Sequence, residues 1–172
     1  MKNLQETDYP AYYSNYINQV ENSDCIDALE ESMNDFVNFI ENIVPAEKYE
    51  YRYQPEKWSI KEIVQHIIDA ERIFAYRALR FARFDKTPLS SFEENDYVDV
   101  CAADKREMSD LLQEFLLVRK STIKMFESFS DEMISNKGIA SGGEVKVLAI
   151  GFIISGHAIH HQKVIKERYL KN

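Results

Sequence analysis

Hydrophobic residues recur along this chain at the spacing of one face of an α-helix, and charged residues fill the positions between them. The pattern is sustained over four stretches, each long enough to bury a continuous apolar face. These stretches are residues 23–44, 60–84, 105–129 and 145–170. Four long amphipathic helices predict an all-α fold, and packing their apolar faces together gives a four-helix bundle.

Short sequence signals mark the ends of these helices. Pro45 follows the first stretch, and Ser59-Ile-Lys-Glu62 has the form of a capping box before the second. In a capping box the serine and glutamate side chains satisfy each other's backbone N–H groups. Ser141-Gly-Gly-Glu144 predicts a turn that leads into a second capping box at the start of the last helix.

The connections between the predicted helices differ in character. Residues 45–57 are polar and rich in tyrosine, whereas residues 85–104 form a long stretch without helical periodicity. In a compact domain such a stretch is either a lid over a substrate or a crossover held down by its aromatic side chains, and the sequence leaves both open. Because 172 residues suit one domain with a sizeable core, residues 1–172 are expected to form a single domain with its core at about 20–170.

Composition supports a folded helical chain and excludes several kinds of partner. Of the 172 residues 45% are hydrophobic, and five glycines and four prolines are too few for a many-stranded sandwich. A net charge of −8 opposes binding to nucleic acid or to an anionic membrane, because both require clustered positive charge. We therefore expect no nucleic-acid and no membrane partner. A small-molecule substrate is expected from the candidate site considered below.

Targeting and cysteine patterns predict a cytoplasmic protein. Residues 1–16 lack the basic start and continuous apolar run of a secretory signal. The most hydrophobic stretch, residues 147–159, is shorter than the roughly 20 residues that span a bilayer. Cys25 and Cys101 lie far apart and in no CxxC spacing, so both are expected to be free thiols.

His157 and His161 are the strongest candidates for chemistry. They are four residues apart on the predicted last helix, so they stack on one face, and that face is the apolar stripe. A single buried imidazole is commonly satisfied by a carbonyl or hydroxyl group. Two neighbouring buried rings leave several nitrogens that need partners, and each nitrogen left without one costs about 1 to 3 kcal/mol of stability. One bound cation satisfies two of these nitrogens. The spacing therefore favours a metal site over core packing.

His66 is the candidate for a third ligand, from a different helix. It lies at the edge of the apolar stripe of the second helix, with Glu62 and Asp69 one turn away on either side. A solvated or salt-linked histidine is therefore also an ordinary explanation of the pattern. If His66 joins the pair, three imidazoles with no fourth protein ligand form an open divalent-metal site. His160 points about 100° away from His161 and is expected to flank the site.

Two familiar metal motifs are absent. Ala158, and not glutamate, follows His157, which argues against the HExxH motif of zincin proteases. No Glu-x-x-His pair occurs on two helices, which disfavours a di-iron carboxylate bundle. The prediction is therefore a site built from histidines, and imidazole ligands accommodate Zn, Ni or Fe.

Two long segments of the chain resemble the DinB-like superfamily. They are residues 57–71, KWSIKEIVQHIIDAE, with Tyr76-Arg77-Ala78 after them, and residues 156–170, GHAIHHQKVIKERYL. The resemblance covers most of the chain, although the middle segments match only in general character. It implies a four-helix bundle of up-up-down-down type. It also implies a divalent-metal site made by one histidine of the second helix and an HxxxH pair of the last helix, which here are His66, His157 and His161.

The functions of this family are less uniform than its fold. Members similar to this chain are described as metal-dependent hydrolases, and related branches join low-molecular-weight thiols such as bacillithiol to electrophiles or are thiol-dependent isomerases. The resemblance implies a divalent-metal-dependent enzyme that activates a low-molecular-weight thiol for transfer to an electrophilic substrate. A metal-dependent hydrolase with water as the nucleophile is the first alternative. A non-enzymatic metal-binding or interaction bundle is the second.

Additional roles are assigned to two charged residues. Asp69 is expected to orient His66 or to act as a base, because ligand imidazoles usually donate their other N–H to an outer group. Glu62 is the other carboxylate in reach, but it is engaged in the capping box. Arg168 continues the stripe of the last helix and is assigned to binding an anionic substrate, although pairing with a carboxylate is the more common role. A homodimer is also expected, since bundles of this kind often dimerise through a helix face.

Overall fold

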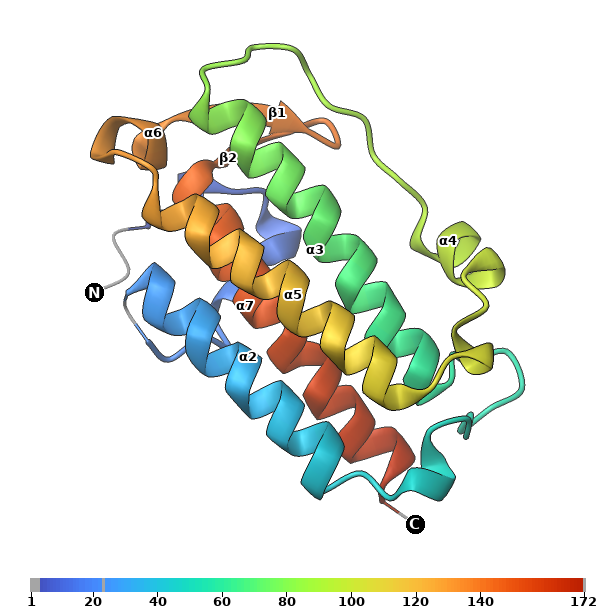
Figure 1. Ribbon diagram of the computed structural model, residues 1–172. Coiled ribbons are helices and arrows are strands. Elements are labelled where there is room, and N and C mark those ends of the chain that lie inside the picture. The colour runs from blue at the N-terminus through green and yellow to red at the C-terminus, as the bar shows by residue number, and fades with distance from the viewer. Residues whose placement is uncertain (1–3, 23, 172) are drawn as a thin grey trace.

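The computed structural model describes residues 4–22 and 24–171, and its main feature is a bundle of long helices (Figure 1). The four long helices are α2 (Cys25–Asn42), α3 (Ile60–Ala82), α5 (Met108–Glu127) and α7 (Val147–Val164). The all-α four-helix bundle expected from the sequence is confirmed. Ser23, the expected first residue of the first helix, lies outside the described residues.

The order of the helices around the bundle is α2, α7, α3, α5, because each packs mainly against its two neighbours in that series. Figure 1 shows that α2 and α7 run in one direction and that α3 and α5 run in the other. The direction order along the chain is therefore up-down-down-up, and the up-up-down-down order expected from the sequence is wrong. The connection between α2 and α3 stays at one end of the bundle, whereas the connection between α3 and α5 runs back along its length.

The long crossover from α3 to α5 packs against the body of the bundle. It contains a short helix, α4 (Glu94–Val100), which the sequence pattern did not predict and which contacts α3. Leu89 ties the crossover to the segment before α7: its N–H donates to the carbonyl of Ile139 at 2.9 Å, and its carbonyl accepts from the N–H of Ser141 at 3.0 Å.

A β-hairpin precedes α7. Strands β1 (Lys137–Ala140) and β2 (Gly143–Lys146) pair antiparallel, and φ is positive at both turn residues, Ser141 (53°) and Gly142 (78°). That combination is typical of a type I′ turn, which the glycine-rich sequence permits. The predicted turn is confirmed, but the predicted second capping box is wrong: Lys146 precedes α7 and makes no side-chain cap.

Short helical turns connect and flank the long helices. They are η1 (Glu6–Asp8), η2 (Ala11–Tyr13), α1 (Ser14–Ile17), η3 (Ala46–Lys48), η4 (Ala103–Lys105), α6 (Asp131–Ser135) and the π-helical turn η5 (Ile165–Tyr169). Among them, α1 packs against α7 and thereby brings the N-terminal segment to the last helix.

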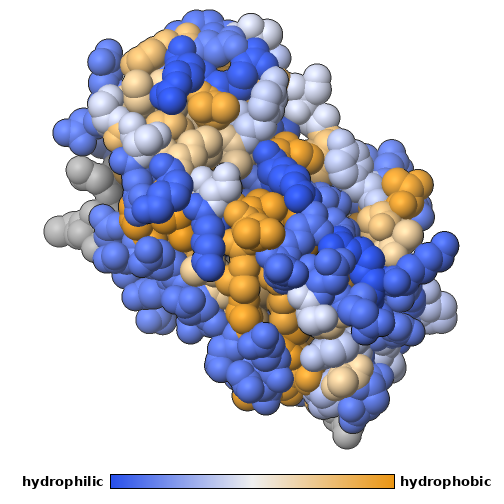
Figure 2. All heavy atoms as spheres, viewed as in Figure 1, coloured by the Kyte–Doolittle hydropathy of each residue, from blue (hydrophilic) through white to orange (hydrophobic). Residues whose placement is uncertain are grey.

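The core lies between the four long helices, and every residue of the first three turns of α7 is buried except Leu148, which is partly buried. This explains why α7 is apolar around most of its circumference and not along one stripe. Figure 2 shows hydrophilic residues over most of one face of the molecule, with hydrophobic residues gathered in a strip that follows the helices. None of the described helices combines the length and hydropathy needed to cross a membrane.

Candidate metal centre

Three histidines converge inside the bundle, one from α3 and two from α7. The Nε2 atom of His157 lies 3.0 Å from the Nε2 atoms of both His66 and His161. Donor atoms of the three residues all lie within 4.8 Å of one another. His66 and His157 are buried and His161 is partly buried. The structure thus brings together the three residues that the sequence singled out.

The spacing of these nitrogens fits one divalent ion. Histidine nitrogens lie about 2.0 to 2.1 Å from a bound zinc, so two of them at about 90° to 110° are roughly 2.8 to 3.4 Å apart. The observed 3.0 Å falls in that range. Hydrogen bonds alone do not satisfy this arrangement. Nε2 of His157 faces two nitrogens, but it carries either one proton or one lone pair and so can serve only one of them. A cation accepts three lone pairs together, so the donor set fits a divalent metal.

The environment keeps all three imidazoles neutral. Burial lowers the pKa of His66 to about 4. Burial, followed by the neighbouring imidazoles, holds the pKa of His157 and of His161 well below the ordinary value. A neutral ring has a free lone pair for a metal, so the three rings are in the ligand form at neutral pH.

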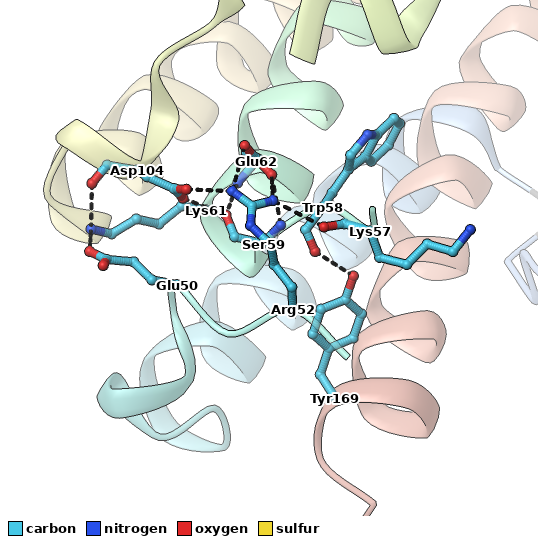
Figure 3. A network of polar contacts seen from close by, with 9 residues as sticks. All are labelled: Glu50, Arg52, Lys57, Trp58, Ser59, Lys61, Glu62, Asp104 and Tyr169. Carbon is cyan, nitrogen blue, oxygen red and sulfur yellow. Dashed lines mark hydrogen bonds and ion pairs between the residues drawn. The ribbon is translucent and has the colours of Figure 1, made fainter. Parts of the chain in front are cut away.

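A polar network fixes the start of α3 beside this centre (Figure 3). The predicted capping box is confirmed: Glu62 N–H donates to Ser59 Oγ at 3.1 Å, and Ser59 N–H donates to a Glu62 carboxylate oxygen at 2.8 Å. Arg52 joins Glu62 to Asp104 by ion pairs to both carboxylates, and Ser59 Oγ donates to Asp104 at 2.5 Å. Glu62 is thus fully engaged at the helix end and does not contact the histidines.

Trp58 covers one side of the centre. The indole ring lies 4.7 Å from the His66 ring and 6.5 Å from the His161 ring, the latter nearly parallel. The hydroxyl of Tyr169 donates to the carbonyl of Trp58 at 2.7 Å, which fixes the backbone that carries the indole (Figure 3). Nδ1 of His161 is buried without a hydrogen-bond partner among the described residues, so no hydrogen bond through that nitrogen orients the ring.

Tyr16, from the N-terminal segment, also packs against the centre. Its ring lies 5.3 Å from the rings of both His157 and His160, edge to face. Gly156 makes this approach possible, because a Cβ atom there would lie 2.1 Å from the carbonyl oxygen of Tyr16. Burial raises the pKa of Tyr16, so its phenol is neutral at pH 7. His160 flanks the cluster, as expected.

Two pockets reach the centre from different sides. One, of about 400 Å³, is lined by His66 and His157 together with aromatic side chains, and the other, of about 240 Å³, is lined by His161 and Trp58. Glu94 of α4 lines the first pocket and the adjacent Asn95 lines the second. A larger hollow of about 660 Å³ around Glu47 and Lys61 includes no histidine. The crossover therefore contributes residues to both approaches to the metal centre.

Comparison with known proteins agrees with this geometry. The DinB superfamily pattern matches residues 28–165, which include all three histidines. The chain belongs to the DinB superfamily. Its fold is similar to that of YfiT from Bacillus subtilis, described as a probable metal-dependent hydrolase with an unusual four-helix bundle topology. The two share 14% identity over 83% of this chain and 82% of YfiT, with a TM-score of 0.72. No curated protein matches the chain in sequence.

Asp69 is not brought to the histidines of this DinB superfamily protein. Its carboxylate accepts from Gln65 Nε2 at 3.0 Å and lies 3.6 Å from Nη1 of Arg72. No hydrogen bond joins Asp69 to His66, so the expected orienting contact is not found. Asp69 comes three residues after His66 on the same helix. Its side chain therefore points about 60° away from that of His66, toward α5. Burial raises the pKa of Asp69.

Arg168 is exposed at the end of the chain. The sequence placed it on the inward stripe of the last helix, but the helix widens into the π-helical turn η5 (Ile165–Tyr169). A π turn adds a residue to the helical turn and shifts which side chain faces inward. Tyr169 is buried in place of Arg168, so the expected continuation of the stripe is wrong.

Sequence reasoning missed the tyrosines of the N-terminal segment. Tyr12, Tyr13 and Tyr16 all line the larger of the two pockets at the histidine cluster. Four tyrosines within residues 9–16 were a visible signal, but nothing local connects that segment to α7. Its contact with α7 depends on Gly156, 140 positions away from Tyr16 (156 − 16).

Proposed function

We propose that this protein is a divalent-metal-dependent enzyme that activates a low-molecular-weight thiol for transfer to an electrophilic substrate. The observation that supports the proposal best is the composition of the centre. Three neutral imidazoles meet, two of them buried and one partly buried, and the cluster includes no carboxylate of the described residues. Two of the rings, His66 and His157, line the pocket of about 400 Å³. Three protein ligands leave coordination positions open for a small molecule.

Each residue of the centre has a definable task. Nε2 atoms of His66, His157 and His161 would hold the ion, because these atoms converge. A divalent ion bound there supplies Lewis acidity, which lowers the pKa of a thiol or of water so that a nucleophile exists near neutral pH. Trp58 and Tyr16 close two sides and keep bulk water from the rings, which strengthens electrostatic interactions inside.

Thiol chemistry suits this pocket better than hydrolysis does. Hydrolysis of an amide or ester requires a group that takes the proton of water and returns it to the leaving group. Glu94, the carboxylate in the pocket with His66 and His157, is exposed at its rim. In thiol transfer the S–H proton passes to solvent, a sulfur lone pair forms the new C–S bond, and the leaving group departs with its bonding electron pair.

The protein's own cysteines are poor sources of that nucleophile. Cys25 is buried, and burial raises its pKa to about 12. Burial also raises the pKa of Cys101. A thiol with a raised pKa is mostly protonated at pH 7 and is therefore a weak nucleophile. The nucleophile is therefore a co-substrate.

Hydrolysis with water as nucleophile is the second candidate function. It is supported by the likeness in fold to YfiT, which is described as a probable metal-dependent hydrolase. It is also supported by the raised pKa of Asp69, since a carboxyl group with a raised pKa is a better proton acceptor. Asp69 would have to act through an intervening group, because no hydrogen bond joins it to the histidines.

One experiment tests the proposal against this alternative. Zinc- or nickel-loaded protein without a polyhistidine tag is assayed for conjugation of bacillithiol or cysteine to monobromobimane and for hydrolysis of p-nitrophenyl acetate. We expect chelator-sensitive conjugation that is lost in His157→Ala and retained in His160→Asn. Chelator-sensitive hydrolysis without conjugation would replace the proposal by the second candidate. The absence of both activities would contradict both candidate functions.

A further inference from the structure

Arg77 is a buried cation without a counterion. Its side chain is 3% exposed, yet the ion pairs among the described residues do not include it. The other fully buried arginine, Arg119, is paired with the buried carboxylate of Glu71. Burying a charge without an opposite charge is costly, so an unpaired buried guanidinium is a feature that needs a partner.

The guanidinium is held in place by neutral oxygens. Nη2 of Arg77 donates to the carbonyl of Ser90 at 2.8 Å and to Oγ of Ser141 at 3.0 Å. Phe74 and Phe92 flank it, each ring centre 5.9 Å from the guanidinium carbon. Of the five N–H donors of an arginine, the three on Nε and Nη1 make no hydrogen bond to a described residue. The cation is thus fixed in position while most of its donors are free.

Arg77 shares a pocket with the metal centre. The pocket of about 400 Å³ is lined by Arg77 and Ser141 as well as by His66 and His157. His66 and Arg77 are 11 residues apart on α3 (77 − 66), which places them about 20° apart on one face and roughly 16 Å apart along the axis. A molecule in this pocket therefore meets the histidines at one end and the guanidinium at the other.

We propose that Arg77 binds the carboxylate end of a small-molecule substrate or co-substrate whose reacting group lies at the three histidines. This inference rests on the proposed function, because it needs the metal centre, but it holds for a thiol and for a hydrolysed substrate alike. It assigns the ligand class: an elongated molecule with a metal-binding group, a part that contacts aromatic side chains, and a terminal carboxylate.

The charges of the pocket favour a carboxylate over a phosphate. Arg77 contributes the one cationic side chain among the described pocket residues, and Glu94 adds a negative charge at the rim. A phosphate monoester carries nearly two negative charges at neutral pH and would remain half-neutralised, whereas one carboxylate is matched by one arginine. Phe74 and Phe92 exclude water around the guanidinium and so strengthen the charge-assisted hydrogen bonds.

A purely structural role for Arg77 is the competing explanation, because its two hydrogen bonds join α3 to the crossover and to the hairpin turn. The two explanations differ in what they predict for ligands. If Arg77 is only structural, its substitution should affect the binding of charged and uncharged ligands equally. If Arg77 binds an anion, its substitution should weaken the binding of the charged ligand alone.

The test uses two metal-binding probes with the same chain length. Suberic acid monohydroxamate ends in a carboxylate and octanohydroxamic acid ends in a methyl group, and the hydroxamate of each binds the ion. Titration calorimetry measures both on the zinc-loaded full chain, in the unsubstituted protein and in Arg77→Gln, Arg77→Lys and Arg83→Gln. Arg83 lies at the end of the same helix, is exposed, and matches the change in charge.

We expect the unsubstituted protein and Arg83→Gln to bind the carboxylate probe about tenfold more tightly than the methyl probe. Arg77→Gln should bind the two probes equally while keeping its affinity for the methyl probe, and Arg77→Lys should retain part of the preference even if Arg77→Gln does not fold. Equal affinities in the unsubstituted protein, or an undiminished preference in Arg77→Gln, would overturn the role of Arg77 and leave the metal centre standing. Failure of both probes to bind the zinc-loaded protein would overturn the proposed function and, with it, this inference.

Discussion

Glu71 and Arg119 form an ion pair in the core, with Nε of Arg119 2.9 Å from each carboxylate oxygen of Glu71. The side chains are 2% and 0% exposed. Nη1 of Arg119 also donates to the carbonyl of Leu29 at 2.9 Å and to Oγ of Ser32 at 2.7 Å. One guanidinium therefore links α2, α3 and α5.

Removing one partner of this pair should destabilise the fold strongly. We expect Glu71→Gln to lower the free energy of unfolding by about 3 to 5 kcal/mol, because a buried charge is left uncompensated. Urea denaturation at pH 7 measures the change. Glu127→Gln, which breaks the exposed ion pair with Lys124, is the control and should leave the midpoint unchanged. A similar midpoint for both variants would contradict the role assigned to the buried pair.

Gly156→Ala should disturb the contact between α1 and α7. The added Cβ would lie 2.1 Å from the carbonyl oxygen of Tyr16, so the N-terminal segment must move away from His157. Overpacking of this kind costs about 1 to 3 kcal/mol. Thermal unfolding measures the loss, and Gly142→Asn is the control, because no atom lies within 4 Å of a Cβ there and asparagine tolerates a positive φ. An unchanged melting temperature for Gly156→Ala would show that α1 does not pack as described.

The metal-free protein should lose stability as the pH falls from about 6.5 toward 4. Burial lowers the pKa of His66 from 6.5 to about 4, so within this window the unfolded chain binds a proton that the folded chain does not. His66 therefore makes its full contribution to the free energy of unfolding above pH 6.5. That contribution declines as the pH falls toward 4, by on the order of 3 kcal/mol.

Urea midpoints between pH 7 and 4.5, measured with chelator present, check this pH dependence. His66→Asn lacks the titrating group, so its midpoint should fall less steeply with decreasing pH than that of the unsubstituted protein. Parallel curves for the two proteins would show that His66 is not the buried neutral group described.

The two cysteines should differ in reactivity. Cys25 is buried with its pKa raised to about 12, whereas Cys101 is partly exposed. With a disulfide reagent at pH 8 we expect one thiol to react quickly and the other only on unfolding. Cys101→Ser should remove the fast phase. Two fast thiols would mean that the region between Cys25 and α7 opens readily.

Much of the fold follows from local signals in the sequence. The four helices follow from apolar periodicity, and the start of α3 follows from Ser59 and Glu62, because a capping box is formed by residues three apart. The same kind of signal failed at Ser141 and Gly142. Glycine-rich turns serve hairpins as well as helix starts, and the pairing of β1 with β2 decides between them.

Only part of the candidate site could be predicted from local signals in the sequence. His157 and His161 share a helix face by spacing alone, but His66 was ambiguous, because its burial depends on Trp58 and α7. Arg77 carried no local signal, since its isolation from carboxylates is a property of the assembled pocket. Arg168 was misplaced because periodicity assumes a regular helix, and the π turn at Ile165–Tyr169 breaks that assumption.

Metal content tests the central claim most directly. Protein purified without a polyhistidine tag, loaded with zinc, nickel or iron and dialysed, is analysed by elemental mass spectrometry beside His157→Ala and His160→Asn. We predict about one bound ion per chain in the unsubstituted protein and in His160→Asn, and almost none in His157→Ala, which loses the nitrogen that faces both other ligands. Equal metal content in all three proteins, or none in any of them, would contradict the three-histidine metal centre.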